Sequence, residues 1–137
     1  WREKKGAVMT SKIKTLVVEY FRGVDDEDIT AVLGTLRFNC VFSIETHRIK
    51  LQGHYQISEM LHRLWKNHQW VRHDHFHYVE DISASDLAVR FRVTNKLHSN
   101  KLIFKSNCNF FTMEASKFSE IRVYMAGENT LNLNEVT

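Results

Sequence analysis

The chain has 137 residues, with 19 Lys and Arg against 16 Asp and Glu, so its formal net charge is +3 at pH 7. The hydrophobic fraction of 43% and the charged fraction of 26% exclude an intrinsically disordered chain, and the absence of Pro excludes collagen-like and Pro-rich classes. So small a charge does not predict a nucleic-acid partner. Cys40 and Cys108 are too few for a disulfide framework, so we expect free thiols in a reducing, cytoplasmic compartment.

We expect a single domain over residues 10–137, preceded at 1–9 by a segment that is flexible or left from expression. Residues 1–6 are charged and lack the apolar stretch of a signal peptide, and Met9 offers a natural start. The longest apolar runs, such as 16–18, have three residues, whereas a transmembrane helix needs about 20. The sequence therefore predicts no membrane segment.

Three segments have the apolar spacing of amphipathic helices. Ser11 suits the N-cap of the first, the acidic run 25–28 suits the N-terminus of the second, and the third is entered through 53–54. Their predicted apolar faces carry, in chain order, Ile13, Leu16, Val17, Tyr20, Phe21 and Val24; Ile29, Val32, Leu33 and Leu36; and Ile57, Leu61, Leu64, Trp65 and His68.

The remainder of the chain is predicted to form strands at 39–47, 49–53, 69–82, 87–95, 101–113 and 118–125. The breaks between the last four strands are short and polar, as between antiparallel neighbours, so these strands are expected to form a meander. Helices followed by strands predict an α+β fold, with the helices on one face of a curved antiparallel sheet.

Alternation along each strand predicts which face lies inside. In 87–94, Val89, Phe91 and Val93 alternate with arginines, and this apolar set should face the helices. In 69–82, the face bounded by valines is predicted to be the concave one. It carries Val71, His73, His75, His77 and Val79. The opposite face carries residues 72, 74, 76, 78 and 80.

Four short motifs accompany this order of elements: YFRGVDDEDI at 20–29, NCVFS at 39–43, LQG at 51–53 and IRVYM at 121–125. Together they resemble the nuclear transport factor 2-like superfamily, in particular the SnoaL-like proteins, over residues 11–125. The resemblance implies a cone-shaped, cystatin-like sheet wrapped around N-terminal helices, a pocket at its open end, and homodimers through the convex face. The superfamily includes polyketide cyclases, ketosteroid isomerases, dehydratases, epoxide hydrolases and non-catalytic binders, so the fold alone does not give the function.

The sequence departs from the ketosteroid isomerases at two of three site positions. The resemblance places their oxyanion-binding tyrosine at Tyr20, their general-base aspartate at Ile44 and their second oxyanion acid at Cys108. Isomerase chemistry through the usual base is therefore not expected. Glu45, one residue further on, would point to the other face unless a bulge intervenes.

The histidines of the predicted concave face are the candidate acid–base groups, because histidine titrates near neutrality. We predict His75, with His73 as its partner, as the general acid and base, and Tyr20 as the donor to the oxygen that gains charge. The predicted ligand pocket also holds His77, Cys108, Phe91, Phe110, Trp65 and His47. The alternative is that these histidines are exposed or hydrogen-bonded structural residues.

No metal and no cofactor are predicted. Alternate residues of a strand lie roughly 6.6 Å apart at Cα, so two histidines could share an ion with a third ligand from His47, His54 or Glu45. This spacing matches no specific zinc signature, and the sequence contains no Gly-rich phosphate loop.

A basic and aromatic set is predicted on the convex face, where it favours a homodimer over nucleic acid. It comprises Arg90, Arg92, Lys101, Lys105, Arg122, Phe76, Tyr78 and Tyr124. The sequence as a whole predicts a SnoaL-like protein that binds a small hydrophobic or carbonyl-bearing molecule, as a cyclase, isomerase or dehydratase with a pocket histidine. The alternative is a non-catalytic module of the same fold that binds a ligand or a protein.

Overall fold

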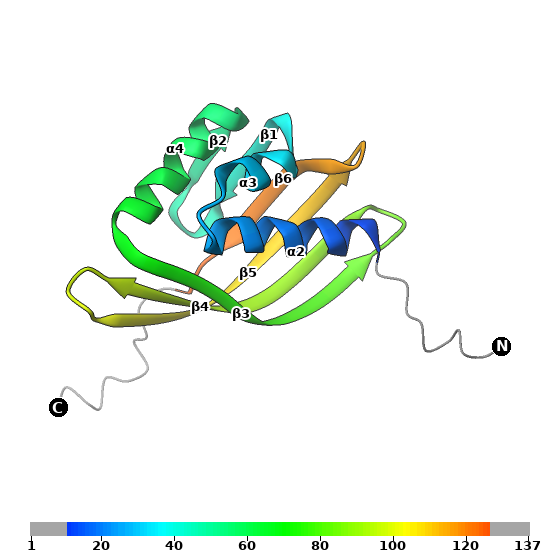
Figure 1. The fold of residues 1–137 in the computed structure, drawn as a ribbon. Coiled ribbons are helices and arrows are strands. Elements are labelled where there is room, and N and C mark those ends of the chain that lie inside the picture. The colour runs from blue at the N-terminus through cyan, green and yellow to red at the C-terminus, as the bar shows by residue number, and fades with distance from the viewer. Residues whose placement is uncertain (1–10, 127–137) are drawn as a thin grey trace.

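The computed structural model describes residues 11–126, and the predicted N-terminal segment 1–9 lies outside them (Figure 1). The helices are α2 (Lys12–Asp25), α3 (Ile29–Gly34) and α4 (Gly53–Lys66), and η1 (Glu45–His47) is a short 3₁₀ helix. The strands are β1 (Leu36–Ile44), β2 (Ile49–Gln52), β3 (His68–Asp81), β4 (Asp86–Leu97), β5 (Leu102–Glu114) and β6 (Lys117–Tyr124). None of the helices described is long and apolar enough to cross a membrane.

The strands form one curved, unclosed sheet in the order β2-β1-β6-β5-β4-β3. β3 to β6 are consecutive antiparallel neighbours, which confirms the predicted meander. β1 pairs antiparallel with β2 but parallel with β6, so the sheet is mixed and the expectation of a wholly antiparallel sheet is corrected at this one pair. The helices lie across the concave face of the sheet (Figure 1), which confirms the α+β fold class.

The predicted caps fix where the first two helices begin. The Ser11 hydroxyl accepts a hydrogen bond from the Lys14 N–H at 3.2 Å, which satisfies a free donor at the start of α2. The Asp28 carboxylate accepts from the Ala31 N–H at 3.1 Å and caps α3 in the same way. α4 begins at Gly53, whose φ of 90° lies in a region that residues with a Cβ rarely adopt.

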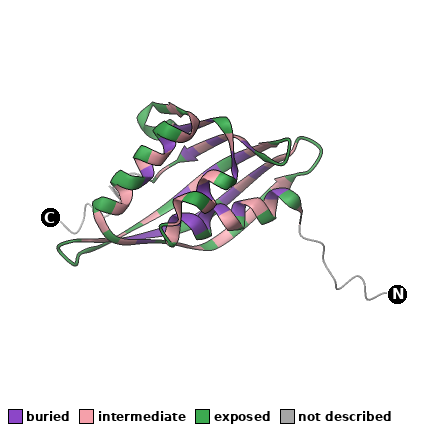
Figure 2. Cartoon of the chain, turned by 45° about the horizontal axis from the view of Figure 1, so that its top comes forward, coloured by how far each residue is buried: buried purple, intermediate pink, exposed green. Residues whose placement is uncertain are grey.

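The core lies between α2 and the concave face of the sheet (Figure 2). Its largest element is a cluster of aromatic rings. The ring of Phe21 lies 4.9 Å from that of Phe91, and the ring of Tyr20 lies 5.4 Å from that of Phe111. Phe111 in turn lies 4.7 Å from Phe118 on β6. These contacts hold the C-terminal half of α2 against the centre of the sheet. They place the end of α2, at Asp25, over β3 and β4.

β3 changes the face it presents at a β-bulge around His75. His75 has a φ of 59°, and the pairing of β3 with β4 shifts between Asp74 and His77. A bulge adds one residue to one strand, so the alternation of side chains resumes in the opposite phase. His75 and His77 are both exposed. The prediction that they face the concave side is therefore wrong.

On either side of this bulge, different residues face the core. Val71 and His73, before the bulge, lie on the inner face as predicted. After it, Phe76 and Tyr78 pack against the core and Val79 is 60% exposed, which reverses the prediction for this half of the strand. The prediction assumed one unbroken alternation along the strand, whereas the core side carries Val71 and His73 before the bulge and Phe76 and Tyr78 after it.

The inner face of β5 is also the opposite of the one predicted. Asn107, Asn109 and Phe111 are buried, whereas Phe110 is 44% exposed and Cys108 is half-buried on the outer face. Two adjacent phenylalanines make either phase of this strand plausible from apolarity alone. The buried phase is the one that carries amides, because the concave face of β5 lines a cavity rather than a continuous apolar core.

Candidate functional site

A cavity of about 360 Å³ opens between α2, α4 and the concave face of the sheet. Most of its wall is apolar and comes from the two helices and all strands except β2. Representative wall residues are Phe21, Val24, Phe42, Leu61, Val93 and Val123. A mostly apolar cavity with a few placed polar groups is the usual form of a small-molecule site.

The most organised polar group in the wall is a histidine–aspartate pair. His73 Nδ1 lies 2.5 Å from Asp25 Oδ1, and the backbone N–H of His73 donates to Asp25 Oδ2 at 2.9 Å. The His73 side chain is 11% exposed and that of Asp25 22%. Asp25 therefore accepts two hydrogen bonds from one residue, which fixes both the position and the ring orientation of His73 and leaves Nε2 free of this partner.

This pair follows from the ends of two elements. Asp25 is the last residue of α2, and His73 lies on β3 just before the bulge. The His73 ring packs 5.0 Å from Phe21 and 5.5 Å from Phe91, so it is wedged between the helix and β4. The sequence indicated Asp25 only as a helix-terminal acid. No local pattern could have joined two residues 48 positions apart.

Tyr20 lines the same cavity from the inner face of α2 and is 5% exposed. Burial, with a smaller contribution from Cys40, raises the pKa of its phenol well above the usual value. The phenol is therefore neutral at physiological pH and remains a hydrogen-bond donor. The location of Tyr20 in the cavity wall agrees with the prediction. Its role as a hydrogen-bond donor to a substrate stays a proposal.

Three buried amides line the floor of the cavity. Asn95, on β4, is 6% exposed, and Asn107 and Asn109, on β5, are 7% and 3% exposed. The Asn107 side-chain oxygen accepts a hydrogen bond from the Ala126 N–H at 3.2 Å. The side-chain oxygens of Asn95 and Asn109 have no partner among the residues described. None of the three amides was predicted in the pocket, because the opposite face of β5 was expected to lie inside and Asn95 was expected to end its strand.

His68 is a further cavity residue, although it was predicted to be a core residue of the third helix. It is the first residue of β3, and its Nδ1 lies 2.7 Å from the carbonyl oxygen of Leu64. Arg63, Asn67 and Lys105 also line the cavity. Lys105 was predicted on the convex face and lies on the concave one instead. Like Asn107 and Asn109, it belongs to the face of β5 that was expected to point outward.

Of the predicted pocket residues, Phe91 lines the cavity together with Tyr20 and His73. His75 is 64% exposed at its side chain and lies 2.9 Å from Asp74, on the outer side of β3. His77 is exposed on the same strand. Neither reaches the cavity.

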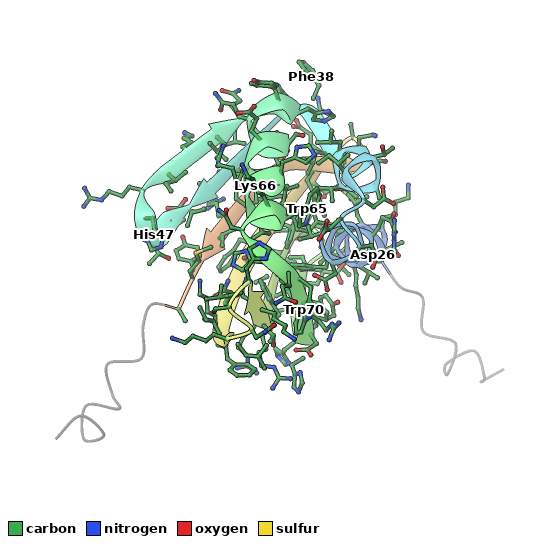
Figure 3. All side chains as sticks on the ribbon, turned by 60° about the vertical axis from the view of Figure 1, so that its left-hand side comes forward. Asp26, Phe38, His47, Trp65, Lys66 and Trp70 are labelled. Atoms are coloured by element: carbon green, nitrogen blue, oxygen red, sulfur yellow. The ribbon has the colours of Figure 1, made fainter. Side chains whose placement is uncertain are left out.

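The other predicted pocket residues lie elsewhere. His47 is exposed in η1, on the side of the molecule away from Asp26 and α2 (Figure 3). Trp65 fixes α4 to α2, because its indole N–H donates to the carbonyl oxygen of Val24 at 2.9 Å. Cys108 and Phe110 lie on the outer face of β5. Burial raises the pKa of the Cys108 thiol.

The position of the isomerase base is apolar here. Ile44 lines the cavity, and Glu45 is an exposed residue of η1 that accepts a hydrogen bond from the Ser43 hydroxyl at 2.6 Å. The histidines that line the cavity, His68 and His73, both lie on β3 instead. Within residues 11–126, no group of three or more His, Cys, Asp or Glu side chains is placed to hold a metal ion.

A scan of the sequence against protein-family models finds no match, and a search of curated proteins finds none either. Many solved structures do match. A protein from Shewanella denitrificans, assigned to the SnoaL-like polyketide cyclases, superposes with a TM-score of 0.79 at 12% identity, over 93% of this chain and 100% of that one.

Two further structures extend this likeness. A protein from Xanthomonas campestris assigned as a polyketide cyclase gives a TM-score of 0.78 at 13% identity, over 91% of this chain and 93% of that one. A protein of ketosteroid isomerase-like fold from Catenulispora acidiphila, in complex with trimethylamine, gives 0.75 at 8% identity, over 85% and 89%. At identities this low the likeness is one of fold. The chain has the nuclear transport factor 2-like fold of the SnoaL-like proteins, as the resemblance of its sequence indicated.

Proposed function

We propose that this protein is a small-molecule enzyme of the cyclase, isomerase or dehydratase type, in which His73 moves a proton on a largely apolar, carbonyl-bearing substrate. The observation that carries the proposal is the His73–Asp25 pair in the wall of an apolar cavity. A histidine held at Nδ1 by a carboxylate presents Nε2 to the cavity as a general base. The polyketide cyclase assignments of two structural neighbours, and the small molecule bound to a third, support this class of function.

In the proposed reaction, His73 Nε2 takes a proton from the carbon next to the substrate carbonyl. The electron pair of the broken C–H bond moves into the enolate, and the Tyr20 hydroxyl donates a hydrogen bond to the enolate oxygen. Asp25 stabilises the imidazolium that results. The imidazolium then gives the proton to another carbon of a conjugated enolate, giving isomerisation, or to a hydroxyl that departs from the β-carbon, giving dehydration. In ring closure the enolate carbon instead attacks a second carbonyl, and the imidazolium protonates the alkoxide oxygen that forms.

His73 here takes the role that the sequence analysis gave to His75. Among the described β3 histidines, His68 and His73 line the cavity, and of these two His73 is the one held by a carboxylate from another element. His75 and His77, exposed on the same strand, are therefore natural control positions.

The test is exchange of solvent deuterium into a panel of cyclic ketones, beginning with β-tetralone, followed by NMR. We expect the protein to speed the exchange above buffer, and His73→Gln to lower the rate by about 10²–10⁴-fold, the usual contribution of a general base. His77→Gln should leave the rate unchanged. A rate that His73→Gln leaves unaltered, or no acceleration across the panel, would count against the proposal.

We also propose that the protein is a homodimer through the convex face of the sheet, as the resemblance implies. Phe104, Phe110 and Tyr124 are 61%, 44% and 43% exposed there, and the ring of Phe110 lies 5.8 Å from that of Tyr124. Exposed aromatics beside Arg90 and Arg122 have the composition of a protein interface. Light scattering should give a dimer for the wild type and a monomer for Phe110→Lys; a wild-type monomer would refute this interface.

The free thiols Cys40 and Cys108 support a reducing, cytoplasmic environment, which also remains a proposal.

A further inference from the structure

We infer that the ligand of this cavity is an organic anion, a carboxylate on an apolar body, anchored by Lys105. The inference rests on the proposed small-molecule function and adds the class of substrate. The charged side chains in the cavity wall support it. Arg63 and Lys105 line the cavity, and among residues 11–126 no Asp or Glu does so. Asp25, which contacts the lining residue His73, already accepts two hydrogen bonds from it.

Lys105 is the better placed of the two cations. It is partly buried on the inner face of β5, and none of the ion pairs found within residues 11–126 involves it. Arg63 is 63% exposed at its side chain and lies 4.0 Å from Glu59 on the surface of α4. A partly buried cation without an ion-pair partner among the described residues has lost some of its hydration, and a bound anion compensates for that loss.

The sheet register relates Lys105 to the proposed base. His73 on β3 pairs with Val93 on β4, and Val93 pairs with Lys105 on β5. The three residues thus form one cross-strand row, in which neighbouring strands lie roughly 4.8 Å apart. A carboxylate held by the Lys105 ammonium therefore leaves the rest of a molecule lying over Val93, with its far end toward His73 Nε2.

Asn107 supplies a second donor next to Lys105. The two residues are on the same face of β5, roughly 6.6 Å apart at Cα. The Asn107 oxygen is occupied by the Ala126 N–H, which fixes the orientation of the amide and leaves the side-chain N–H₂ as a donor to the cavity. An ammonium and an amide N–H₂ side by side match the two oxygens of a carboxylate.

The charge at the C-terminal end of α4 favours the same class of ligand. Lys66 lies there as the last residue of α4 (Figure 3), and its backbone carbonyl oxygen is 2.8 Å from His98 Nε2 in the β4–β5 turn. This contact places the turn against the end of α4. Lys96, near the end of β4, and Lys101, just before β5, lie on either side of the turn. Cations around the end of a cavity raise the local concentration of anions and their rate of entry.

The test compares two probes of the same shape that differ in charge, naphthoate and naphthamide, by isothermal titration calorimetry. For the wild type we expect naphthoate to bind about 10-fold more tightly than naphthamide. Lys105→Met should remove this preference and leave naphthamide binding unchanged. Lys105→Arg should retain most of it. Lys50→Met, which removes an exposed charge from β2, a strand that does not line the cavity, is the matched control and should keep the preference.

The outcomes separate this inference from the proposed function. If naphthamide binds as tightly as naphthoate, or the preference survives Lys105→Met, the anion inference is overturned, while the cavity and the proposed role of His73 stand. If neither probe binds at millimolar concentration, the inference is overturned together with the small-molecule function. If the preference depends on Lys105 but His73→Gln leaves ketone exchange unchanged, the protein is an anion-binding module and only the catalytic proposal fails.

Discussion

The two halves of β3 carry the same kind of residue in opposite environments. Before the bulge, His73 is 11% exposed at its side chain, packed between Phe21 and Phe91 and bound by Asp25. Within the bulge, the His75 side chain is 64% exposed and its Nδ1 lies 2.9 Å from the carboxylate of the neighbouring Asp74. One added residue in the backbone separates a candidate general base from a surface histidine. The chemistry of a histidine on this strand is thus set by the phase of the strand and not by the alternating pattern.

The two faces of β5 show the same contrast, and give the largest expected effect. Phe111 is fully buried against Tyr20 and Phe118, whereas its neighbour Phe110 is 44% exposed on the outer face. Phe111→Ala should lower the free energy of unfolding by about 3–5 kcal/mol, because it opens a cavity in the core. Phe110→Ala should cost less than about 1 kcal/mol.

Urea denaturation of both variants at one low protein concentration measures this difference. The choice of low concentration keeps the proposed dimer from contributing to the result, since dimerisation adds stability by mass action. Similar losses for the two variants would mean that the inner face of β5 is not the one described.

The next effect concerns the two hydrogen bonds that Asp25 accepts from His73. In Asp25→Asn one of the two carboxylate oxygens becomes an NH₂ group, which cannot accept a hydrogen bond. The amide is also neutral and cannot balance a positive charge on the His73 ring. We expect the ring to lose its single tautomer and the rate of ketone exchange to fall by about 10²-fold, toward the lower end of general-base contributions. Asp25 is a positioning residue, so ¹⁵N NMR of the His73 ring must show the change of tautomer as well as the slower rate.

Asp26→Asn is the control for this prediction. Asp26 is the next residue, 60% exposed at its side chain and 3.0 Å from Arg22, and it does not touch His73. A lower rate in Asp25→Asn with an unchanged ¹⁵N spectrum, or equal effects of the two substitutions, would show that the carboxylate acts only on stability.

These contrasts explain which parts of the structure were predictable. Helix faces and the β3–β6 meander follow from local periodicity, so the spacing of Val17, Tyr20 and Phe21 and the short polar breaks were enough. The site depends on long-range geometry. Asp25 and His73 meet across 48 residues. The bulge at His75 is seen in its backbone φ and in the shifted pairing with β4, and the inner phase of β5 is seen in the packing of Phe111 against Tyr20 on α2. The pocket positions of Tyr20, Phe91 and His73 were predicted correctly because each residue lies on a helix or strand face that its apolar neighbours mark as the inner one.

A smaller effect tests the bulge itself. His75 has a φ of 59°, a region that His tolerates better than β-branched residues do. His75→Val should therefore cost about 1–2 kcal/mol of unfolding free energy more than His77→Val, because only the first substitution forces a branched side chain into this conformation. Thermal or urea unfolding of the two variants provides the comparison. Equal stabilities would mean that the strand continues without the bulge, and that His75 and His77 can then reach the concave face.

The smallest effect is the acid dependence of the pair on the outer side of the bulge. The hydrogen bond from the His75 side chain, and to a smaller extent the hydrogen bonds from Arg92, hold the pKa of the Asp74 carboxyl below its ordinary value of 3.8. A carboxyl with a lowered pKa in the folded state stabilises the fold above its ordinary value, and this contribution is lost as the pH falls through 3.8 toward the folded-state value. The stability difference between the wild type and Asp74→Asn should therefore shrink below this pH. Because the group is exposed, solvent screens the pair, and we expect the difference to stay within about 1 kcal/mol and to fall in high salt. A difference that is constant with both pH and salt would show that Asp74 supports the bulge through its shape alone.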